Sequence, residues 1–158
     1  MQEIRIDLSE QEMRMAAYTG VEWRIHAILN NYKPKVTDKH PWHTNIEGAM
    51  GELVYAKACN RYWRAGVNTF KRVADVDRME VRTRSEPWHE LLIRPDDIDT
   101  RIFVLITGQC PTYFVRGYFR CGEAKQHQEW LDDKGNNGAP AYFVPHAYLH
   151  DFTVKEKK

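Results

Sequence analysis

The chain has 158 residues, of which 42% are hydrophobic and 28% are charged, and its net charge at neutral pH is +1. This length is typical of one domain, and such a composition excludes a disordered or fibrous protein. The small net charge also excludes a uniformly basic protein, so any affinity for nucleic acid must come from local clusters of Lys and Arg.

The sequence carries no feature of a membrane or secreted protein. The longest apolar run, residues 102–106, is too short to cross a bilayer, and residues 1–7 lack the apolar stretch of a signal peptide. The cysteines include no CxxC pair, which argues against a disulfide framework and against a thiolate zinc site. We therefore expect a cytoplasmic protein with no membrane partner and with free thiols at Cys59, Cys110 and Cys121.

An N-terminal helix is predicted within residues 9–33. Ser9 and Glu12 have the spacing of a capping box, in which each side chain accepts the other residue's backbone N–H. Apolar residues then recur at helical spacing until Pro34 ends the pattern. Residues 34–43 are therefore expected to form a connecting loop.

A second helix is predicted over residues 44–63, where Met50 and Leu53 belong to an apolar stripe. Gly48 and Gly51 lie inside this helix, and each costs about 1 kcal/mol relative to alanine. Such a cost is compensated where another segment approaches too closely for a side chain. We therefore expect another backbone to pack tightly against this helix.

The remaining pattern is mainly that of β-strands. The predicted strands are 67–72, 78–84, 90–94, 101–107 and 113–119. Because residues 102–106 are apolar on both faces, their strand should be central and covered by helices. A short helix that starts near Gly122 and includes Trp130, a turn-rich loop over 132–140 and an edge strand over 142–144 complete the pattern. The expected fold is α/β or α+β, with a central mixed sheet of about five strands flanked by helices.

The most informative stretch runs from Asp75 to Arg84. Alternation over residues 78–84 places Glu80, Arg82 and Arg84 on one face of a strand. Residues two apart on a strand are roughly 6.6 Å apart and point the same way, so Glu80 and Arg82 can address one phosphate. Asp75 can supply a second carboxylate, and hard cations such as Mg²⁺ prefer oxygen ligands. The pattern therefore indicates a metal-assisted phosphate site.

These residues resemble the PD-(D/E)XK nuclease superfamily, whose signature is an Asp followed by an (Asp/Glu)-x-Lys strand, with an acidic residue often placed on a preceding helix. Asp75 matches the first acid, Glu80 and Arg82 stand at the two ends of the second motif, and Glu52 would be the helical acid. The chain also looks like small members of this superfamily that are found in bacteriophage genomes.

The resemblance implies a domain organisation. Residues 44–119 would form a restriction-endonuclease-like core, and the N-terminal helix would precede it. Residues 120–158 would follow as a C-terminal helix, loop and tail. All of these parts would belong to one domain, residues 1–158.

The resemblance also implies an active site. Glu52, Asp75 and Glu80 would hold Mg²⁺ or Mn²⁺, and a metal-bound water would attack a phosphodiester bond of DNA. Arg82 replaces the lysine of the family. An arginine stays protonated and cannot act as a general base, but it can stabilise the phosphate. The implied function is a magnesium-dependent deoxyribonuclease with catalytic residues Glu52, Asp75, Glu80 and Arg82.

Basic residues near this site are the expected DNA contacts. They are Arg61, Arg64, Lys71, Arg72 and Arg84. Lys57 or Lys71 could in addition bring a lysine into the site. Cutting both strands of a duplex would favour a homodimer, since one small site handles one strand at a time. A phage-encoded protein of this kind would act in the cytoplasm of its bacterial host.

The carboxylates also have simpler interpretations. Glu52 could face solvent and pair with Lys57 or Arg61, and Glu47 is its rival as a metal ligand. Asp75 could be a turn residue at the start of a strand. Each of these interpretations would remove one ligand from the predicted site.

Two further alternatives concern the strand and the function. Glu80 and Arg82 could form a surface ion pair, worth at most about 1 kcal/mol. Tyr62, Trp63 and Trp88 lie near basic residues and could stack on bases, but the favoured interpretation of these aromatic residues is that they belong to the core. A nuclease fold that has lost catalysis would act as a DNA-binding module, or as a phage protein that binds a host protein.

Overall fold

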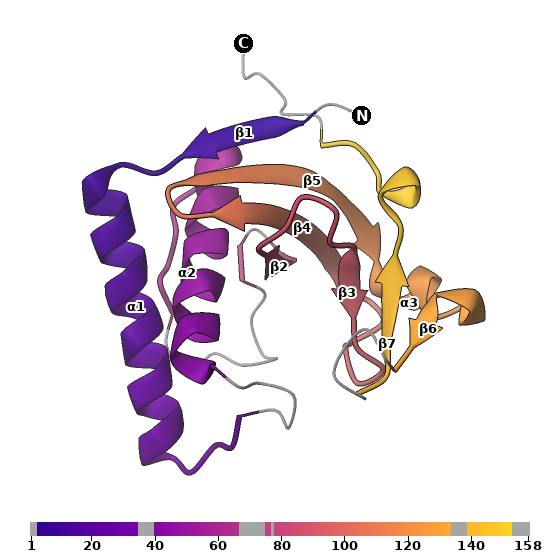
Figure 1. Ribbon diagram of the computed structural model, residues 1–158, viewed down its shortest axis with the longest axis horizontal. Helices are drawn as coiled ribbons and strands as arrows, with labels where there is room; N and C mark the ends of the chain where they lie inside the picture. Colours follow the sequence, from indigo (N-terminus) through magenta and orange to yellow (C-terminus); the bar gives the residue numbers. More distant parts are fainter. Residues whose placement is uncertain (1–2, 35–39, 67–74, 77, 134–138, 153–158) are drawn as a thin grey trace.

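The protein combines helices with two β-sheets in a mixed α+β fold (Figure 1). The computed structural model describes residues 3–34, 40–66, 75–76, 78–133 and 139–152. Within these ranges the helices are α1 (Glu10–Leu29), α2 (Pro41–Ala58) and α3 (Cys121–Ala124), with the 3₁₀ turns η2 (Gln128–Trp130) and η4 (His146–Tyr148). The strands are β1 (Ile4–Asp7), β2 (Met79–Arg84), β3 (Leu91–Ile93), β4 (Ile102–Gln109), β5 (Thr112–Arg120), β6 (Leu131–Asp132) and β7 (Ala141–Val144). The predicted α+β class is confirmed.

The main sheet has four strands in the order β1-β5-β4-β2. It is mixed, because β2 runs parallel to β4 whereas β5 pairs antiparallel with both β1 and β4. A second, smaller sheet has the order β3-β7-β6 and is antiparallel. Strand β2 therefore lies at an edge of the main sheet in the part of the chain that the structure describes.

The sheets differ from the single sheet of about five strands that the sequence predicts. Strand β1 is too short for its alternation to be recognised. The predicted strand 90–94 forms β3 but belongs to the second sheet, and the predicted edge strand 142–144 forms β7, which lies between β3 and β6. The predicted helix from Gly122 to Trp130 is divided into α3 and η2. The predicted strand 67–72 falls outside the described residues.

Helix α1 starts at the predicted capping box. The backbone N–H of Glu12 donates to Ser9 Oγ at 3.2 Å, and the backbone N–H of Ser9 donates to Glu12 Oε2 at 2.7 Å. Helix α1 packs along α2, which lies between α1 and the main sheet (Figure 1). Gly20 permits this close packing, because a Cβ there would lie 2.5 Å from the Cα of Ile46.

Helix α2 lies tightly against strand β2 at Gly51. The helix begins at Pro41, earlier than predicted, because proline suits the first turn of a helix. A Cβ at Gly51 would lie 1.8 Å from Thr83 Oγ1, so the side chain from β2 takes the space of a side chain on α2. A Cβ at Gly48 would lie 3.7 Å from the Trp23 ring, which is ordinary contact. A close approach is therefore found at Gly51, where the approaching group is a side chain and not the expected backbone. The same expectation is wrong at Gly48.

Strand β4 is apolar on both faces, as predicted, and each face belongs to a different core. Val104 and Ile106 pack in the core that contains Val54 of α2. Phe103 and Leu105 pack in a second core with β3, β7, the short helix α3 and the 3₁₀ turn η2. The expectation that helices cover both faces is therefore correct for the α2 side only, because the second sheet covers most of the other side.

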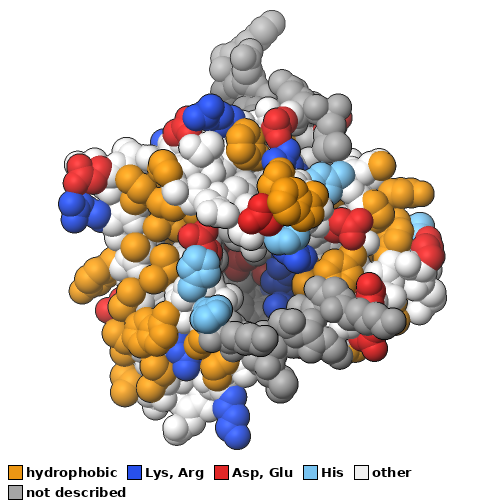
Figure 2. All heavy atoms as spheres, in the orientation of Figure 1, with side chains coloured by type: hydrophobic (Ala, Val, Ile, Leu, Met, Phe, Trp, Pro, Cys, Tyr) orange, Lys and Arg blue, Asp and Glu red, His pale blue; other side chains and the backbone are white. Residues whose placement is uncertain are grey.

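Large apolar side chains are exposed along the outer side of α1. Met15, Tyr18, Ile25 and Leu29 are 48%, 71%, 38% and 75% exposed, and their spacing places them on one stripe. Figure 2 shows hydrophobic side chains gathered over this side of the molecule. The predicted homodimer stays a prediction.

Searched over the described ranges, the chain contains no helix with the length and apolar character needed to span a membrane.

Candidate functional site

Three carboxyl groups from separate parts of the chain meet beside the start of β2. Glu52 projects from α2, Asp75 precedes β2, and Glu80 is the second residue of that strand. Asp75 is the central member, because its charge raises the pKa of both Glu52 and Glu80. Figure 2 shows acidic and basic side chains together inside a hollow at the centre of the visible face. The tertiary structure therefore brings together the three carboxylates that were predicted as metal ligands.

A tight turn places Asp75 against the edge of β2. The backbone N–H of Met79 donates to the Val76 carbonyl oxygen at 2.7 Å, and the reverse hydrogen bond is 3.1 Å long. The chain reverses at this turn, so Asp75 Oδ2 can accept the backbone N–H of Val81 at 2.7 Å. Asp75 thus has the local structural role of a turn residue in addition to its place among the carboxylates.

Burial raises the pKa of all three carboxyl groups. It raises the pKa of Glu52 to about 8, and the charge of Asp75 adds to this effect, whereas Trp63 Nε1–H opposes it by donating at 3.0 Å. Burial and then the charge of Asp75 raise the pKa of Glu80 to about 7, and Arg101, 3.7 Å away, opposes them. Burial also raises the pKa of Asp75, although a backbone hydrogen bond opposes it. At neutral pH the group therefore retains protons instead of carrying three full charges.

Glu52 is turned inward, so its interpretation as a solvent-facing residue is wrong. Lys57, one of the partners considered for it, donates from Nζ to Glu12 at 2.8 Å and to the Asp7 carbonyl oxygen at 2.9 Å. These contacts direct Lys57 toward α1 and β1, so it does not bring a lysine to the carboxylates. The other candidate, Lys71, lies outside the described residues.

Arg82 lies beside the carboxylates, but other groups hold it. Its Nη2 donates to both carboxylate oxygens of Asp97 at 2.9 and 2.8 Å, and its Nε donates to a backbone carbonyl of β3 at 3.2 Å. Its guanidinium carbon lies 4.6 Å from the centre of the Phe103 ring. The alternative ion pair between Glu80 and Arg82 is not the one that forms, because Glu80 pairs with Arg101. Any phosphate bound by Arg82 would share it with Asp97.

The predicted DNA contacts fall into three groups. Arg84 is half-buried at the end of β2, whereas Arg61 and Arg64 are exposed in the segment after α2. Lys71 and Arg72 lie outside the described residues. The three positions that are described therefore do not form one continuous strip along a single element.

The aromatic residues near these positions differ in burial. Trp63 is 7% exposed and bonds Glu52, so its interpretation as a core residue is correct. Tyr62 and Trp88 are 89% and 70% exposed, so the same interpretation is wrong for them. Aromatic type alone does not separate these residues, because their burial depends on the tertiary structure around each ring.

Two arginines were not predicted here, Arg101 beside Glu80 and Arg94 close enough to Arg82 to feel its charge. Arg101 precedes β4 and reaches Glu80 because the parallel pairing sets Met79 opposite Ile102. Burial lowers the pKa of Arg94, and the charge of Arg82 lowers it further. The sequence offers no local signal for Arg101, because the pairing of β2 with β4 brings it to Glu80.

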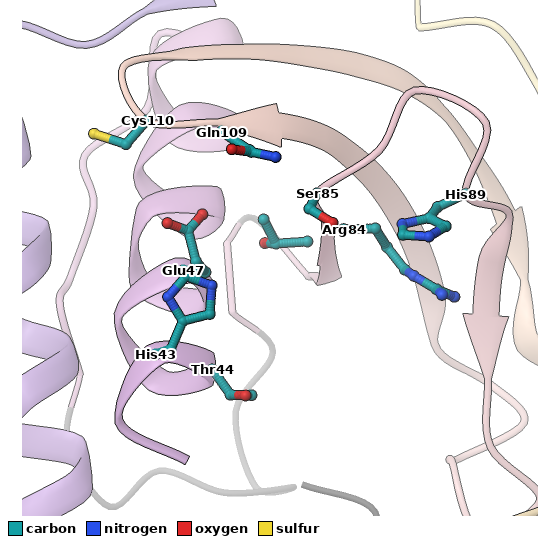
Figure 3. A pocket seen from close by; sticks show the side chains of 9 residues that line it. His43, Thr44, Glu47, Arg84, Ser85, His89, Gln109 and Cys110 are labelled. Carbon is teal, nitrogen blue, oxygen red and sulfur yellow. The ribbon is translucent and has the colours of Figure 1, made fainter. Parts of the chain in front are cut away.

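A pocket of about 610 Å³ opens between α2 and the far end of β2 (Figure 3). Its lining residues are His43, Thr44 and Glu47 of α2, Thr83, Arg84 and Ser85 at the end of β2, His89, Gln109 and Cys110. Glu47 accepts a hydrogen bond from the hydroxyl group of Tyr113 at 2.8 Å. Glu47, the predicted rival of Glu52, therefore belongs to this pocket and not to the group of three carboxylates.

The donor chemistry of the carboxylate group is that of a hard-cation site, since magnesium prefers carboxylate oxygens. In the parts of the chain that are described, however, no group of three or more His, Cys, Asp or Glu side chains has the arrangement that holds a metal ion. Comparison of the chain with models of known protein families, with curated proteins and with solved structures finds no match.

Proposed function

We propose that the protein is a metal-dependent phosphodiesterase that cleaves DNA with a PD-(D/E)XK nuclease fold. The observation that carries this proposal is the buried group of Glu52, Asp75 and Glu80, which comes from three separate segments. Burial and mutual repulsion make such a group unfavourable for stability. Carboxyl groups that are buried together and have strongly shifted pKa values are typical of functional sites.

The arrangement of elements supports the proposed fold. The acid on α2 belongs to a helix that packs on a mixed sheet, and Glu80 belongs to the edge strand of that sheet. Asp75 is held at the start of this strand by its bond to Val81. The order of the helical acid, the turn acid and the strand acid is the order that the superfamily motif requires.

The three carboxylates are a suitable donor set for a hard divalent cation. Bound Mg²⁺ or Mn²⁺ would lower the pKa of a coordinated water and neutralise charge on the phosphate. Glu52 and Glu80 would release protons as they become ligands, because burial keeps them partly protonated at neutral pH. Metal affinity is therefore expected to rise as the pH increases through about 7 to about 8.

Two arginines complete the proposed site. Arg101 lies 3.7 Å from Glu80, so it can contact a phosphate that is placed at that carboxylate. Arg82 stays protonated and can bind a phosphate oxygen, while Asp97 fixes the direction of its guanidinium group. Both residues would orient the phosphodiester bond, and neither would remove a proton from water.

The test is cleavage of supercoiled, linear and branched DNA with magnesium, manganese or EDTA. The wild type should cut in the presence of metal. The Glu80→Ala variant should cut at least roughly 100-fold more slowly, because one metal ligand is lost. Glu123→Ala is the matched control, since Glu123 is an exposed carboxylate on α3. Circular dichroism of each variant establishes that the fold is retained.

The alternative is a nuclease fold that binds DNA without cutting it, and the arginine at position 82 is the observation that favours it. Metal-independent DNA binding without cleavage would support this alternative. Cleavage gained in Arg82→Lys would then identify the missing lysine as the reason. A wild type that neither binds nor cuts DNA would contradict both proposals and favour a protein-binding role.

A further inference from the structure

The pocket and the carboxylate group share the same two elements. Glu47 and Glu52 are five positions apart on α2, which corresponds to about 7.5 Å along the helix axis. Glu80 and Arg84 are four positions apart on β2, which corresponds to about 13 Å along the strand. The pocket therefore lies toward one end of the two elements that carry Glu52 and Glu80, about 7.5 to 13 Å along them from these carboxylates.

One wall of the pocket supplies positive charge and hydrogen-bond donors. Arg84 is half-buried, and Nη1 donates to the Glu90 carbonyl oxygen at 3.3 Å, which orients the guanidinium group. A guanidinium group has five N–H donors in a fork that matches a phosphate. His89 Nδ1 accepts the backbone N–H of Glu86 at 3.3 Å, so the neutral imidazole carries its proton on Nε2. This wall is suited to an anion.

The opposite wall supplies the Glu47 carboxylate, which accepts hydrogen bonds and repels an anionic group. The hydroxyl group of the buried Tyr113 donates to Glu47 Oε2 at 2.8 Å, which fixes the carboxylate at the edge of the pocket. Figure 3 shows Glu47 and His43 on the α2 side, across from Arg84 and His89. A carboxylate held in this way can accept N–H donors from the edge of a nucleobase. The two walls together match a ligand with an anionic end and a donor-bearing end.

We propose that this pocket binds one unpaired nucleotide, with its phosphate at Arg84 and the edge of its base at Glu47. The volume of about 610 Å³ is in the range of about 300–1,000 Å³ that is usual for small-ligand sites. A base that is paired and stacked in a duplex cannot enter such a pocket, so the nucleotide must be single-stranded or turned out of the helix. As an extension that rests on the proposed function, the phosphodiester bond next to this nucleotide lies at Glu52, Asp75 and Glu80.

Cys110 offers a direct measurement of occupancy. It lines the pocket and is exposed, whereas Cys59 is half-buried and Cys121 is buried. Burial and the charge of Glu47 raise the pKa of the Cys110 thiol, so the labelling reaction is run at mildly alkaline pH, where more thiolate is present. The rate of reaction with a maleimide reports the pocket, and the rate for Cys110→Ser is subtracted to remove labelling at Cys59.

The full-length protein is labelled in EDTA with dGMP, deoxyguanosine or inorganic phosphate. Guanine carries adjacent N–H donors for Glu47, so dGMP should protect Cys110 at a concentration about 10-fold lower than deoxyguanosine or phosphate requires. Arg84→Met should raise the required dGMP concentration by about 10-fold or more. Arg120→Met is the matched control, because Arg120 lies at the end of β5 beside Ile102, at the other end of β4 from Arg84. If Arg84→Met does not fold, Glu47→Gln tests the wall that faces the base. In this variant dGMP should protect Cys110 no better than inorganic phosphate does.

The outcomes separate this inference from the proposed function. Protection by dGMP that is lost in Arg84→Met supports the pocket whether or not DNA is cut. Equal protection by phosphate and dGMP, or no protection by either, overturns it even if the protein cleaves DNA. If the protein cleaves DNA, Arg84→Met should slow the cleavage of DNA with unpaired nucleotides by about 10-fold. An unchanged rate overturns the claim that the bond next to the bound nucleotide lies at the carboxylates. Protection by dGMP without any cleavage overturns the nuclease proposal and leaves a nucleotide-binding pocket.

Discussion

Glu52 on α2 and Asp75 ahead of β2 interact through their carboxyl groups, and burial raises the pKa of both. The folded protein therefore binds a proton that the unfolded chain releases well below neutral pH. This linkage makes the carboxylate group a measurable term in stability, independent of any activity.

The stability of the metal-free protein should fall as pH rises through this titration. For Glu52 the ordinary pKa is 4.5 and the folded value is about 8, so in this window the folded state binds more protons and the free energy of unfolding decreases with pH. Glu52→Gln removes the titration of Glu52 and keeps a side-chain oxygen that can accept the Trp63 Nε1–H. One pKa unit corresponds to about 1.4 kcal/mol. The free energy of unfolding of Glu52→Gln should therefore exceed that of the wild type by about 1 kcal/mol or more at alkaline pH.

Urea denaturation of both proteins in EDTA, between about pH 5 and pH 8, measures this difference. The exposed carboxylate control, Glu123→Gln, should follow the wild type at every pH. A difference between wild type and Glu52→Gln that stays constant with pH would contradict the buried-proton interpretation.

Gly51→Ala should destabilise the protein by about 1–3 kcal/mol, because the new methyl group would meet Thr83 Oγ1 and the packed interface must shift. Gly48→Ala is the matched control in the same helix, where the methyl group has room beside Trp23. It should be neutral or stabilise by up to about 1 kcal/mol through helix propensity. Thermal denaturation decides between these signs, and equal effects at the two positions would refute the tight contact between α2 and β2.

Two ion pairs of similar length should differ widely in their importance. In the pair of Arg82 and Asp97 the side chains are 20% and 10% exposed, whereas in the pair of Arg14 and Glu10 they are 76% and 65% exposed. Asp97→Asn should cost about 3 kcal/mol, because it weakens the pairing of a largely buried guanidinium group. Glu10→Gln should cost less than about 0.5 kcal/mol. Chemical denaturation measures both, and similar losses would show that the burial of Arg82 has no energetic consequence.

Lys57→Met should leave DNA cleavage unchanged within about twofold and lower stability by about 1 kcal/mol, since its amino group bonds Glu12 and the Asp7 carbonyl. The measurement is the rate of cleavage beside the denaturation midpoint, with Glu80→Ala as the inactive reference. A large loss of cleavage in a fully folded Lys57→Met protein would mean that this lysine does serve the carboxylate site.

Local rules predicted the parts of the fold that depend on neighbouring residues. The Ser9 capping box, the helical spacing after it and the doubly apolar strand at 102–106 each involve interactions within a few residues or a repeat of fixed period. The three carboxylates were also identified in advance, because the order of a helical acid, a turn acid and a strand acid is visible along the chain. Their mutual contact was only an expectation at that point.

Tertiary structure decided which of these residues meet and what surrounds them. The parallel pairing of β2 with β4 brought Arg101 to Glu80, and the turn after β3 presented Asp97 to Arg82. The packing of α2 against β2 created the pocket around Glu47. The sequence alone determined the residue types and the short-range elements, because capping and periodicity act locally. Partners and burial depend on the pairing of strands far apart in the chain, and a one-dimensional pattern does not specify that pairing.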